Sequence, residues 1–332
     1  MTGYFRPLVQ TGLARPADAV PLAGGPGWFT QAQELTRDGG GAFVSASEIP
    51  ADILDWLSRP RAPIAGLDMS QPHLMGILNV TPDSFSDGGQ HDTLEAACAR
   101  AQQMIADGAA LIDIGGESTR PGAEFVPEDE EIRRTGPVIR AVLAEREIPI
   151  SIDTRKSAVA RAALQAGAGL VNDVSGFTFD ADLAPLCAEA GVPVCVMHAQ
   201  GDPATMQQRP FYENVVLDVY DFLSDQVNTL VSKGISRDAI VIDPGIGFGK
   251  TLDHNLAILQ NLSVFHGIGC AILLGASRKR FIGTIGEVAE AQDRAPGSIA
   301  VGLAGIAQGV QILRVHDVAE TAQALRLWRA VS

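Results

Sequence analysis

The sequence predicts an α/β fold, a single (β/α)8 TIM barrel with an N-terminal extension. From residue 73 onward, short β-branched runs alternate with amphipathic stretches, and there are eight such runs. Runs that are apolar on both faces are typical of parallel strands covered by helices, and eight strand-helix units can close into a barrel. An open doubly wound sheet is the alternative. The predicted strands are 73–80, 111–116, 149–153, 170–174, 192–198, 239–243, 270–277 and 311–315.

Residues 1–60 lack this alternation. They are rich in glycine and proline, as in LAGGPGW (22–28), and one short helix is predicted around DILDWL (52–57). We therefore divide the chain into an N-terminal extension of unknown role, residues 1–60, and a barrel domain, residues 61–332. The extension is expected to pack outside the barrel or to be partly disordered.

The segments between the predicted strands show helical periodicity. In residues 213–234, apolar side chains recur at i, i+3, i+4 and i+7, which predicts one buried helix face. Gly234 stands where a glycine commonly ends a helix. The apolar positions are Val216, Val219, Tyr220, Leu223, Val227, Leu230 and Val231.

Composition narrows the classes of function. The chain has 332 residues, of which 46% are apolar and 19% charged, enough for a large buried core. Its net charge of −14 argues against nucleic acid and anionic membranes as partners, although a local basic pocket can still bind an anion. The four cysteines lack C-x-x-C spacing, and no run resembles a signal peptide or membrane span. We expect a cytoplasmic protein with reduced thiols and no zinc site.

Polar side chains follow all eight predicted strands. The carboxyl ends of barrel strands meet on one face, so these side chains should converge on one pocket. A polar residue at one strand end is ordinary where the strand reaches water, but the whole set predicts a binding site. The set is Asn79, Glu117, Asp153, Asn172, His198, Asp243, Ser277 with Arg278 and Lys279, and Arg314 with His316.

The chemistry of this set indicates two adjacent subsites. Asp153, Asn172 and Asp243 end apolar strands, where an unpaired carboxylate is costly, and they suit the donor and acceptor edge of a flat heterocycle. The second subsite suits a polyphosphate. Its cations and donors are Arg120, Arg278, Lys279, Arg314 and His316.

Two polar loops and one glycine-rich stretch complete the predicted site. NVTPDSFSDGG (79–89) and GGESTRPGAE (115–124) are suited to close over a substrate, and Asp87 with Asn79 could form a magnesium site beside a diphosphate. The stretch DPGIGFGKT (243–251) is not a P-loop, because Pro244 stands where the first glycine is required.

Together these residues resemble the dihydropteroate synthase family of the folate pathway. The resemblance covers about residues 65–332 and follows the family's order of motifs. It implies condensation of (7,8-dihydropterin-6-yl)methyl diphosphate with 4-aminobenzoate, giving 7,8-dihydropteroate and diphosphate, with Mg2+ as cofactor and a homodimer as the assembly. The motifs are GILNVTPDSFSDGG, IDIGGESTRPGA, SIDT, VNDVSG, VMHAQGDP, IDPGIGFGK, GASRKRFIG and RVHDV.

The resemblance also implies a role for each site residue. Asp153, Asn172, Asp243 and Lys279 would bind the pterin. Asn79, Arg120, Arg314 and His316 would bind the diphosphate, with Asn79 and Asp87 as metal ligands. Phe85, Thr119, Pro121 and Arg280 would bind 4-aminobenzoate, where sulfonamides compete in this family. Asp87, Arg120, Lys279, Arg314 and His316 would form the catalytic set, and the reaction would proceed by dissociative loss of diphosphate and attack by the arylamine.

Two departures from the family pattern are visible. Arg280 follows Lys279 where many members have serine, which leaves open how the benzoate carboxylate is held, and Ala199 stands where methionine is common. Three alternative functions remain. They are a pterin-barrel methyltetrahydrofolate methyltransferase, a catalytically silent pterin-binding paralogue, and a phosphate-binding sugar isomerase on the same fold.

Overall fold

Eight parallel strands close into a barrel, in the order β10-β11-β12-β13-β6-β7-β8-β9. The structure, a computed structural model, describes residues 3–81, 90–118, 125–201 and 210–332, with the backbone alone for 90–93. The predicted barrel is confirmed and the open sheet is wrong, because every strand has two neighbours. The strands are β6 (His73–Asn79), β7 (Leu111–Gly115), β8 (Ile150–Asp153), β9 (Leu170–Asp173), β10 (Val194–Met197), β11 (Ile240–Asp243), β12 (Ala271–Leu274) and β13 (Ile312–Val315).

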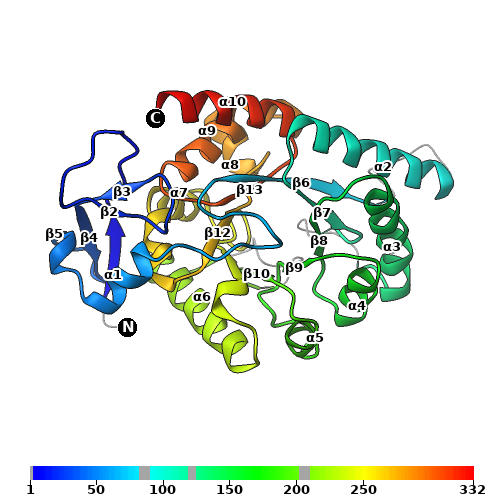
Figure 1. Cartoon of the computed structure of the whole chain (residues 1–332), viewed down its shortest axis with the longest axis horizontal. Coiled ribbons are helices and arrows are strands. Elements are labelled where there is room, and N and C mark those ends of the chain that lie inside the picture. The colour runs from blue at the N-terminus through cyan, green and yellow to red at the C-terminus, as the bar shows by residue number, and fades with distance from the viewer. Residues whose placement is uncertain (1–2, 82–89, 119–124, 202–209) are drawn as a thin grey trace.

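Helices follow the strands and cover the outside of the barrel (Figure 1). The last helix, α10, packs against α2, the first helix of the barrel, so the ring of helices closes as the sheet does. The helices are α2 (Gln90–Asp107), α3 (Glu128–Glu145), α4 (Ser157–Gln165), α5 (Leu183–Ala190), α6 (Val215–Ser232), α7 (Leu252–Gln260), α8 (Arg280–Ile285), α9 (Ala295–Ile306) and α10 (Val318–Val331), with 3-10 turns η3 (Arg237–Ala239), η4 (Leu262–Ile268) and η5 (Ala291–Arg294).

Helix α6 forms where its periodicity predicts it. Asn214 caps its start by accepting a hydrogen bond from the Leu217 N–H at 3.3 Å. Gly234, which follows the C-cap residue Lys233, has a φ of +99°, the left-handed conformation that ends many helices. The predicted apolar face is buried except for Val231, which is 40% exposed.

The barrel interior is apolar at its amino end and polar at its carboxyl end. Leu111, Leu170, Val241 and Ile312 face inward on four strands and belong to one buried cluster. Side chains two residues apart on a strand share a face, so the residues two positions further along also point inward. These residues are Asp113 on β7, Asn172 on β9, Asp243 on β11 and Arg314 on β13.

A short segment before β6 closes the amino end of the barrel. Ile64 and Leu67 pair with each other, and Ile64 and Met69 pack into the interior cluster. The side chains of Ile64 and Met69 are each 1% exposed, and the burial of each contributes about 1.5–3 kcal/mol to folding. This segment therefore covers the interior cluster at the amino end of the barrel.

The N-terminal extension lies outside the barrel, shown in blue in Figure 1. It has its own apolar cluster, which includes Phe29 and Leu57, and β1 and α1 pack against η4. Its elements are β1 (Tyr4–Pro7), β2 (Val20–Pro21), β3 (Trp28–Phe29), β4 (Gln31–Leu35), β5 (Phe43–Ser45), η1 (Ala46–Glu48) and α1 (Ala51–Ser58). Helix α1 contains the predicted DILDWL helix.

Arg61 joins the extension to the barrel. Its guanidinium is buried and donates to four backbone carbonyls, those of Trp56 at 2.8 Å, His266 at 2.9 Å, Arg59 at 3.0 Å and Cys270 at 3.1 Å. Burial lowers the pKa of Arg61 to about 10, so it remains a cation at neutral pH. One buried cation therefore connects α1, η4 and the start of β12.

Two further sequence expectations concern cysteines and membranes. Cys98, Cys187, Cys195 and Cys270 are all free. Among the helices of the described residues, none combines the length and apolar character needed to cross a membrane.

Candidate active site

The polar residues predicted at the strand ends meet at the carboxyl end of the barrel. Asn79, Gly115, Asp153 and Asn172 are successive partners in the register of β6, β7, β8 and β9. Gly115 keeps this side of the mouth open, because a Cβ there would lie 3.4 Å from Asp153 Cβ and 3.8 Å from Asn79 Oδ1. Backbone pairing alone thus sets three predicted side chains around a small gap.

Arg314 connects this side of the mouth to two buried carboxylates. Its Nε donates to Asp113 Oδ2 at 2.6 Å and its Nη2 donates to Asp153 Oδ2 at 2.7 Å. Asp113 Oδ2 also accepts from Asn172 Nδ2 at 3.2 Å. A carboxylate can only accept, so this contact turns the amide oxygen of Asn172 away from Asp113.

Two carboxylate oxygens in this network lack partners in the described part of the chain, Asp113 Oδ1 and Asp153 Oδ1. Burial raises the pKa of Asp153 to about 7, against the opposing effect of Arg314 and with the added repulsion of Asp113. Burial also opposes the charge of Arg314, but Asp113 and Asp153 outweigh it and raise the guanidinium pKa above its usual value. The site thus offers buried acceptors for N–H donors.

Asp243 ends β11 at the same end of the barrel. Its Oδ1 accepts from the Gly245 N–H at 2.8 Å, and its Oδ2 lies 3.4 Å from the place where a Cβ on Gly275 would be. Burial raises the pKa of Asp243, and Gly245, Lys279, Lys250 and Arg314 oppose that shift. The influence of Lys279 and Arg314 agrees with a single site shared by β11, β12 and β13.

The glycine-rich stretch 243–251 folds around the side-chain nitrogen of Lys250, whose pKa burial lowers to about 7. Lys250 Nζ is buried and donates to the carbonyls of Gly245 at 2.9 Å and Phe248 at 3.1 Å. It also lies 2.8 Å from His198 Nδ1, and burial lowers the pKa of His198 to about 2, so this neutral ring accepts. Gly245 has a φ of +70°, and a Cβ there would lie 1.8 Å from the His198 oxygen. The glycines permit a tight turn, and Lys250 satisfies its carbonyls.

Lys279 lies over this turn. Its Nζ is 4.1 Å from the centre of the Phe248 ring, and a Cβ on Gly247 would be 3.5 Å from the same nitrogen. Lys279 is the N-cap residue of α8, and Arg280, the first residue of that helix, is exposed. The structure therefore brings Lys279 to the Asp243 side of the mouth.

Ser277, which follows β12, is hydrogen-bonded to His316, which follows β13. Ser277 Oγ accepts from the His316 N–H at 3.2 Å and lies 3.0 Å from His316 Nδ1. Arg278, assigned to the cation group from the sequence, donates to Asp317 through Nε at 3.0 Å. It is thus paired with a carboxylate in this structure.

Several predicted site residues lie outside the described residues. They are Phe85, Asp87, Thr119, Arg120 and Pro121, so their predicted roles stay predictions. Glu117, which the sequence grouped with the strand ends, is instead buried in an ion pair with Lys156 at 3.0 Å. Within the described residues, no group of three or more His, Cys, Asp or Glu side chains could hold a metal ion.

Sequence reasoning missed Asp113. It sits inside the apolar run LIDIGG and not after it, and only the polar residues after each run were considered. A charged residue in a strand buried on both faces requires a partner, which is a signal the sequence does contain. The role of Lys250 was also missed, because its ligands are backbone carbonyls that sequence does not reveal.

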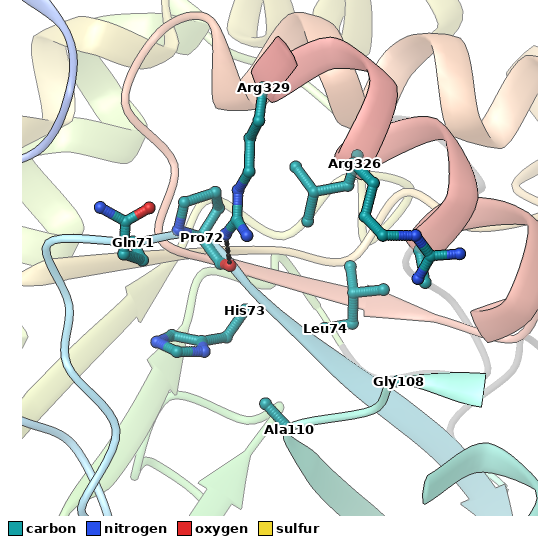
Figure 2. A pocket seen from close by; sticks show the side chains of 10 residues that line it. Gln71, Pro72, His73, Leu74, Gly108, Ala110, Arg326 and Arg329 are labelled. Carbon is teal, nitrogen blue, oxygen red and sulfur yellow. Dashed lines mark hydrogen bonds between the residues drawn. The ribbon is translucent and has the colours of Figure 1, made fainter. Parts of the chain in front are cut away.

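A pocket of about 250 Å3 lies at the opposite end of the barrel (Figure 2). It is bordered by the start of β6 and by α10, and Figure 2 shows Arg329 donating to the Pro72 carbonyl, at 2.7 Å. None of the predicted site residues lines it. Active sites of these barrels lie at the carboxyl end, so this pocket is not the candidate active site.

Comparison with known proteins agrees with the geometry. The pterin binding enzyme family matches residues 75–316. The dihydropteroate synthase of Escherichia coli K12 is 45% identical over 264 residues, which cover 80% of this chain and 93% of that protein. The chain belongs to the dihydropteroate synthase family. The family resemblance seen in the sequence is thereby confirmed.

Solved structures of the family share this fold. Dihydropteroate synthase of Xanthomonas albilineans with 4-aminobenzoic acid is 44% identical, with a TM-score of 0.77, and the match covers 82% of this chain and 98% of that one. The Yersinia pestis dihydropteroate synthase in a sulfonamide drug complex is 43% identical, with the same TM-score and coverage.

Proposed function

We propose that this chain condenses (7,8-dihydropterin-6-yl)methyl diphosphate with 4-aminobenzoate to give 7,8-dihydropteroate and diphosphate in folate biosynthesis. The observation that supports this most is the meeting of Asp113, Asp153, Asn172 and Arg314 in one buried network beside Asp243. Buried acceptors without partners suit the N–H groups of a pterin, and the adjacent cation suits a diphosphate.

The pterin would bind across the barrel mouth. Asp243 would accept from the amino-pyrimidine edge through Oδ2, since its Oδ1 already accepts from Gly245. Asn172 would present its amide oxygen, because its Nδ2 donates to Asp113. Asp153 would accept through Oδ1, and Lys279 would donate to the carbonyl side of the ring.

The diphosphate would bind beside Arg314, His316 and Asn79, with Arg120 from the loop after β7. Breaking the bond between the methylene carbon and the diphosphate oxygen leaves a cation delocalised into the dihydropterin ring. Arg314 contacts the ring-site carboxylates, so the leaving group would depart next to a fixed positive charge. Preorganised charge at the leaving group is the main source of rate enhancement in this scheme.

The arylamine of 4-aminobenzoate would then attack the methylene carbon. The new carbon–nitrogen bond replaces the carbon–oxygen bond, and the amine loses one proton. Phe85, Thr119 and Pro121 would line this subsite, with Arg280, exposed at the start of α8, near the benzoate carboxylate. We expect sulfonamides to compete with 4-aminobenzoate here.

Magnesium fits the donor set. Asn79 supplies a neutral amide oxygen at the mouth, and Asp87 is the second proposed ligand. Magnesium usually binds through one or two protein oxygens together with substrate phosphates, so this sparse set suits an ion that arrives with the diphosphate. When bound, it would neutralise part of the diphosphate charge.

We also propose a homodimer in the cytoplasm. Helix α9 carries no charged residue, and Pro296, Ala300 and Ala304 are exposed on it. An apolar helix surface of small residues suits close packing against a second copy of the same chain. The four free cysteines support a cytoplasmic location.

A turnover assay tests the proposed reaction. Purified protein with magnesium, the pterin diphosphate and 4-aminobenzoate should form dihydropteroate, and omission of either substrate should abolish the product. A sulfonamide should raise the KM for 4-aminobenzoate without changing kcat. Pterin binding without turnover would contradict the proposal and favour a catalytically silent paralogue.

A further inference from the structure

The two ends of the segment 118–125 are held together by a buried ion cluster. Glu117 precedes this segment at the end of β7, and Val126 follows it just before α3. Glu117 Oε1 accepts from the Val126 N–H at 3.1 Å. The two residues that flank the segment, nine positions apart in sequence, are therefore hydrogen-bonded to each other.

Lys156, at the start of α4, contacts both Glu117 and Val126. Its Nζ donates to the Val126 carbonyl at 2.6 Å and to Glu131 Oε2 at 2.7 Å, and lies 3.0 Å from Glu117 Oε2. The three N–H groups of one ammonium are thus matched by three oxygens. We call Glu117, Val126, Glu131 and Lys156 the Lys156 clamp.

The clamp is buried and rigidly placed. Lys156 is 1% exposed and Glu131 is 0% exposed. Lys156 is the N-cap residue of α4, three positions after Asp153, and Glu131 lies in the first turn of α3. Removal of a charge from such a cluster leaves unpaired buried charge, so the clamp acts as a unit.

In sequence, the clamp adjoins two residues assigned to the predicted chemistry. Thr119 and Arg120 follow Glu117 by two and three positions, and they are the proposed 4-aminobenzoate and diphosphate contacts. The hydrogen bonds and ion pairs of the clamp join its own members, and none of them is shared with the Asp113–Arg314 network. The clamp therefore makes no hydrogen bond to that network, and it reaches the pterin site through the charge of Glu131, which helps to raise the pKa of Asp153, and through the segment it anchors.

We propose that Lys156 and Glu117 are positioning residues for the reaction, which fix the anchor points of the 118–125 segment relative to the pterin site. This inference rests on the proposed function. Neither residue is among the proposed substrate contacts. A positioning error of about 1 Å can reduce turnover about 100-fold, so loss of the clamp should affect kcat far more than pterin binding.

Three variants of the full chain test this proposal. Lys156→Met removes the ammonium, and Glu117→Gln keeps an oxygen for the Val126 N–H while removing the charge. Arg133→Met is the matched control, because Arg133 is a 55% exposed cation on α3 that pairs with Glu130 and has no contact with the clamp. For each variant, kcat, both KM values, the dissociation constant of a dihydropterin and amide hydrogen exchange would be measured.

The proposal predicts that Lys156→Met lowers kcat about 100-fold and raises the KM for 4-aminobenzoate, with the pterin dissociation constant changed less than about threefold. Glu117→Gln should also lower kcat and raise the KM for 4-aminobenzoate, but each change should be smaller than in Lys156→Met. Amide exchange in peptides covering 118–126 should rise about tenfold or more in both variants and stay unchanged in Arg133→Met.

Two results would overturn the proposal. One is unchanged amide exchange in both clamp variants. The other is a pterin affinity that falls in step with kcat, which would mean that the cluster supports the ring site itself. Should Lys156→Met fail to fold, Glu117→Gln decides by the same measurements. Exchange is read without turnover, so failure of the proposed reaction would be distinguished from failure of the clamp.

Discussion

Substitution of Asp243 by asparagine separates ligand recognition from folding. The Asn oxygen can still accept from the Gly245 N–H, which Asp243 Oδ1 does at 2.8 Å, but an amide N–H2 replaces Oδ2 at the ligand. A charge-assisted hydrogen bond of about 1.5–3 kcal/mol is lost, and the unsatisfied pterin donor costs about 1–3 kcal/mol more. The expected loss of pterin affinity is therefore about 100-fold to 10,000-fold.

The stability of the folded Asp243→Asn variant, in contrast to its pterin affinity, should increase or stay unchanged. Burial raises the pKa of Asp243, which means that its charge is costly in the ligand-free protein. Asparagine removes that cost, so the Tm of Asp243→Asn should equal or exceed that of the natural chain.

Calorimetric titration of a dihydropterin and thermal unfolding provide the two measurements. Asp173→Asn is the matched control, because Asp173 is buried on β9 next to Asn172, and successive side chains on a strand point to opposite faces. Asp173 accepts from the Ser175 N–H through Oδ1 and from the Phe177 N–H through Oδ2, whereas Asp243 accepts from the backbone through one oxygen only. Asparagine can replace only one of the two acceptors of Asp173, so this variant should lower the Tm and leave pterin affinity unchanged. Unchanged affinity in Asp243→Asn, or a loss explained by unfolding, would refute the reasoning.

Four further predictions concern other parts of the molecule. Gly115→Ala should fold but lower turnover, because its methyl group enters the gap beside Asp153 Cβ at 3.4 Å; kcat and Tm check this. The pKa of Asp153 is raised to about 7, so protonated Asp153 stabilises the fold fully below about pH 4, and this stabilisation is lost as pH rises through about 7. Between pH 5 and pH 8, the free energy of unfolding of the natural chain should therefore fall by about 2–3 kcal/mol relative to Asp153→Asn, as measured by urea unfolding. Arg61→Ala should lower the free energy of unfolding by about 3 kcal/mol or more, because four backbone carbonyls lose their donor and two of these hydrogen bonds are fully buried; denaturant titration measures it. Arg120→Ala should leave pterin binding measurable and slow product formation in a single-turnover assay.

The sequence was sufficient to predict the barrel. Strands buried on both faces must be apolar throughout, so each strand lies within an apolar run that the sequence displays. The same logic placed Asp153, Asn172 and Asp243 at strand ends. The register that makes Asn79, Gly115 and Asp153 neighbours follows from backbone pairing between strands, which the sequence does not specify.

The internal partners of the site could not be predicted in this way. Arg314 was assigned to diphosphate, and its contacts with Asp113 and Asp153 join residues 201 and 161 positions apart. Glu117 looked like one more polar strand end, whereas its partner Lys156 lies beyond the next strand. Ion pairs of this kind depend on which side chains the closed barrel brings together.

A crystal structure of this protein with bound 7,8-dihydropteroate tests the central claim most directly. We predict that the pterin ring lies at the carboxyl end of the barrel, with its amino-pyrimidine edge within hydrogen-bond distance of Asp243 Oδ2 and its other donors near Asp153 and Asn172. A ring bound elsewhere, or one that leaves Asp243 without contact, would contradict the account.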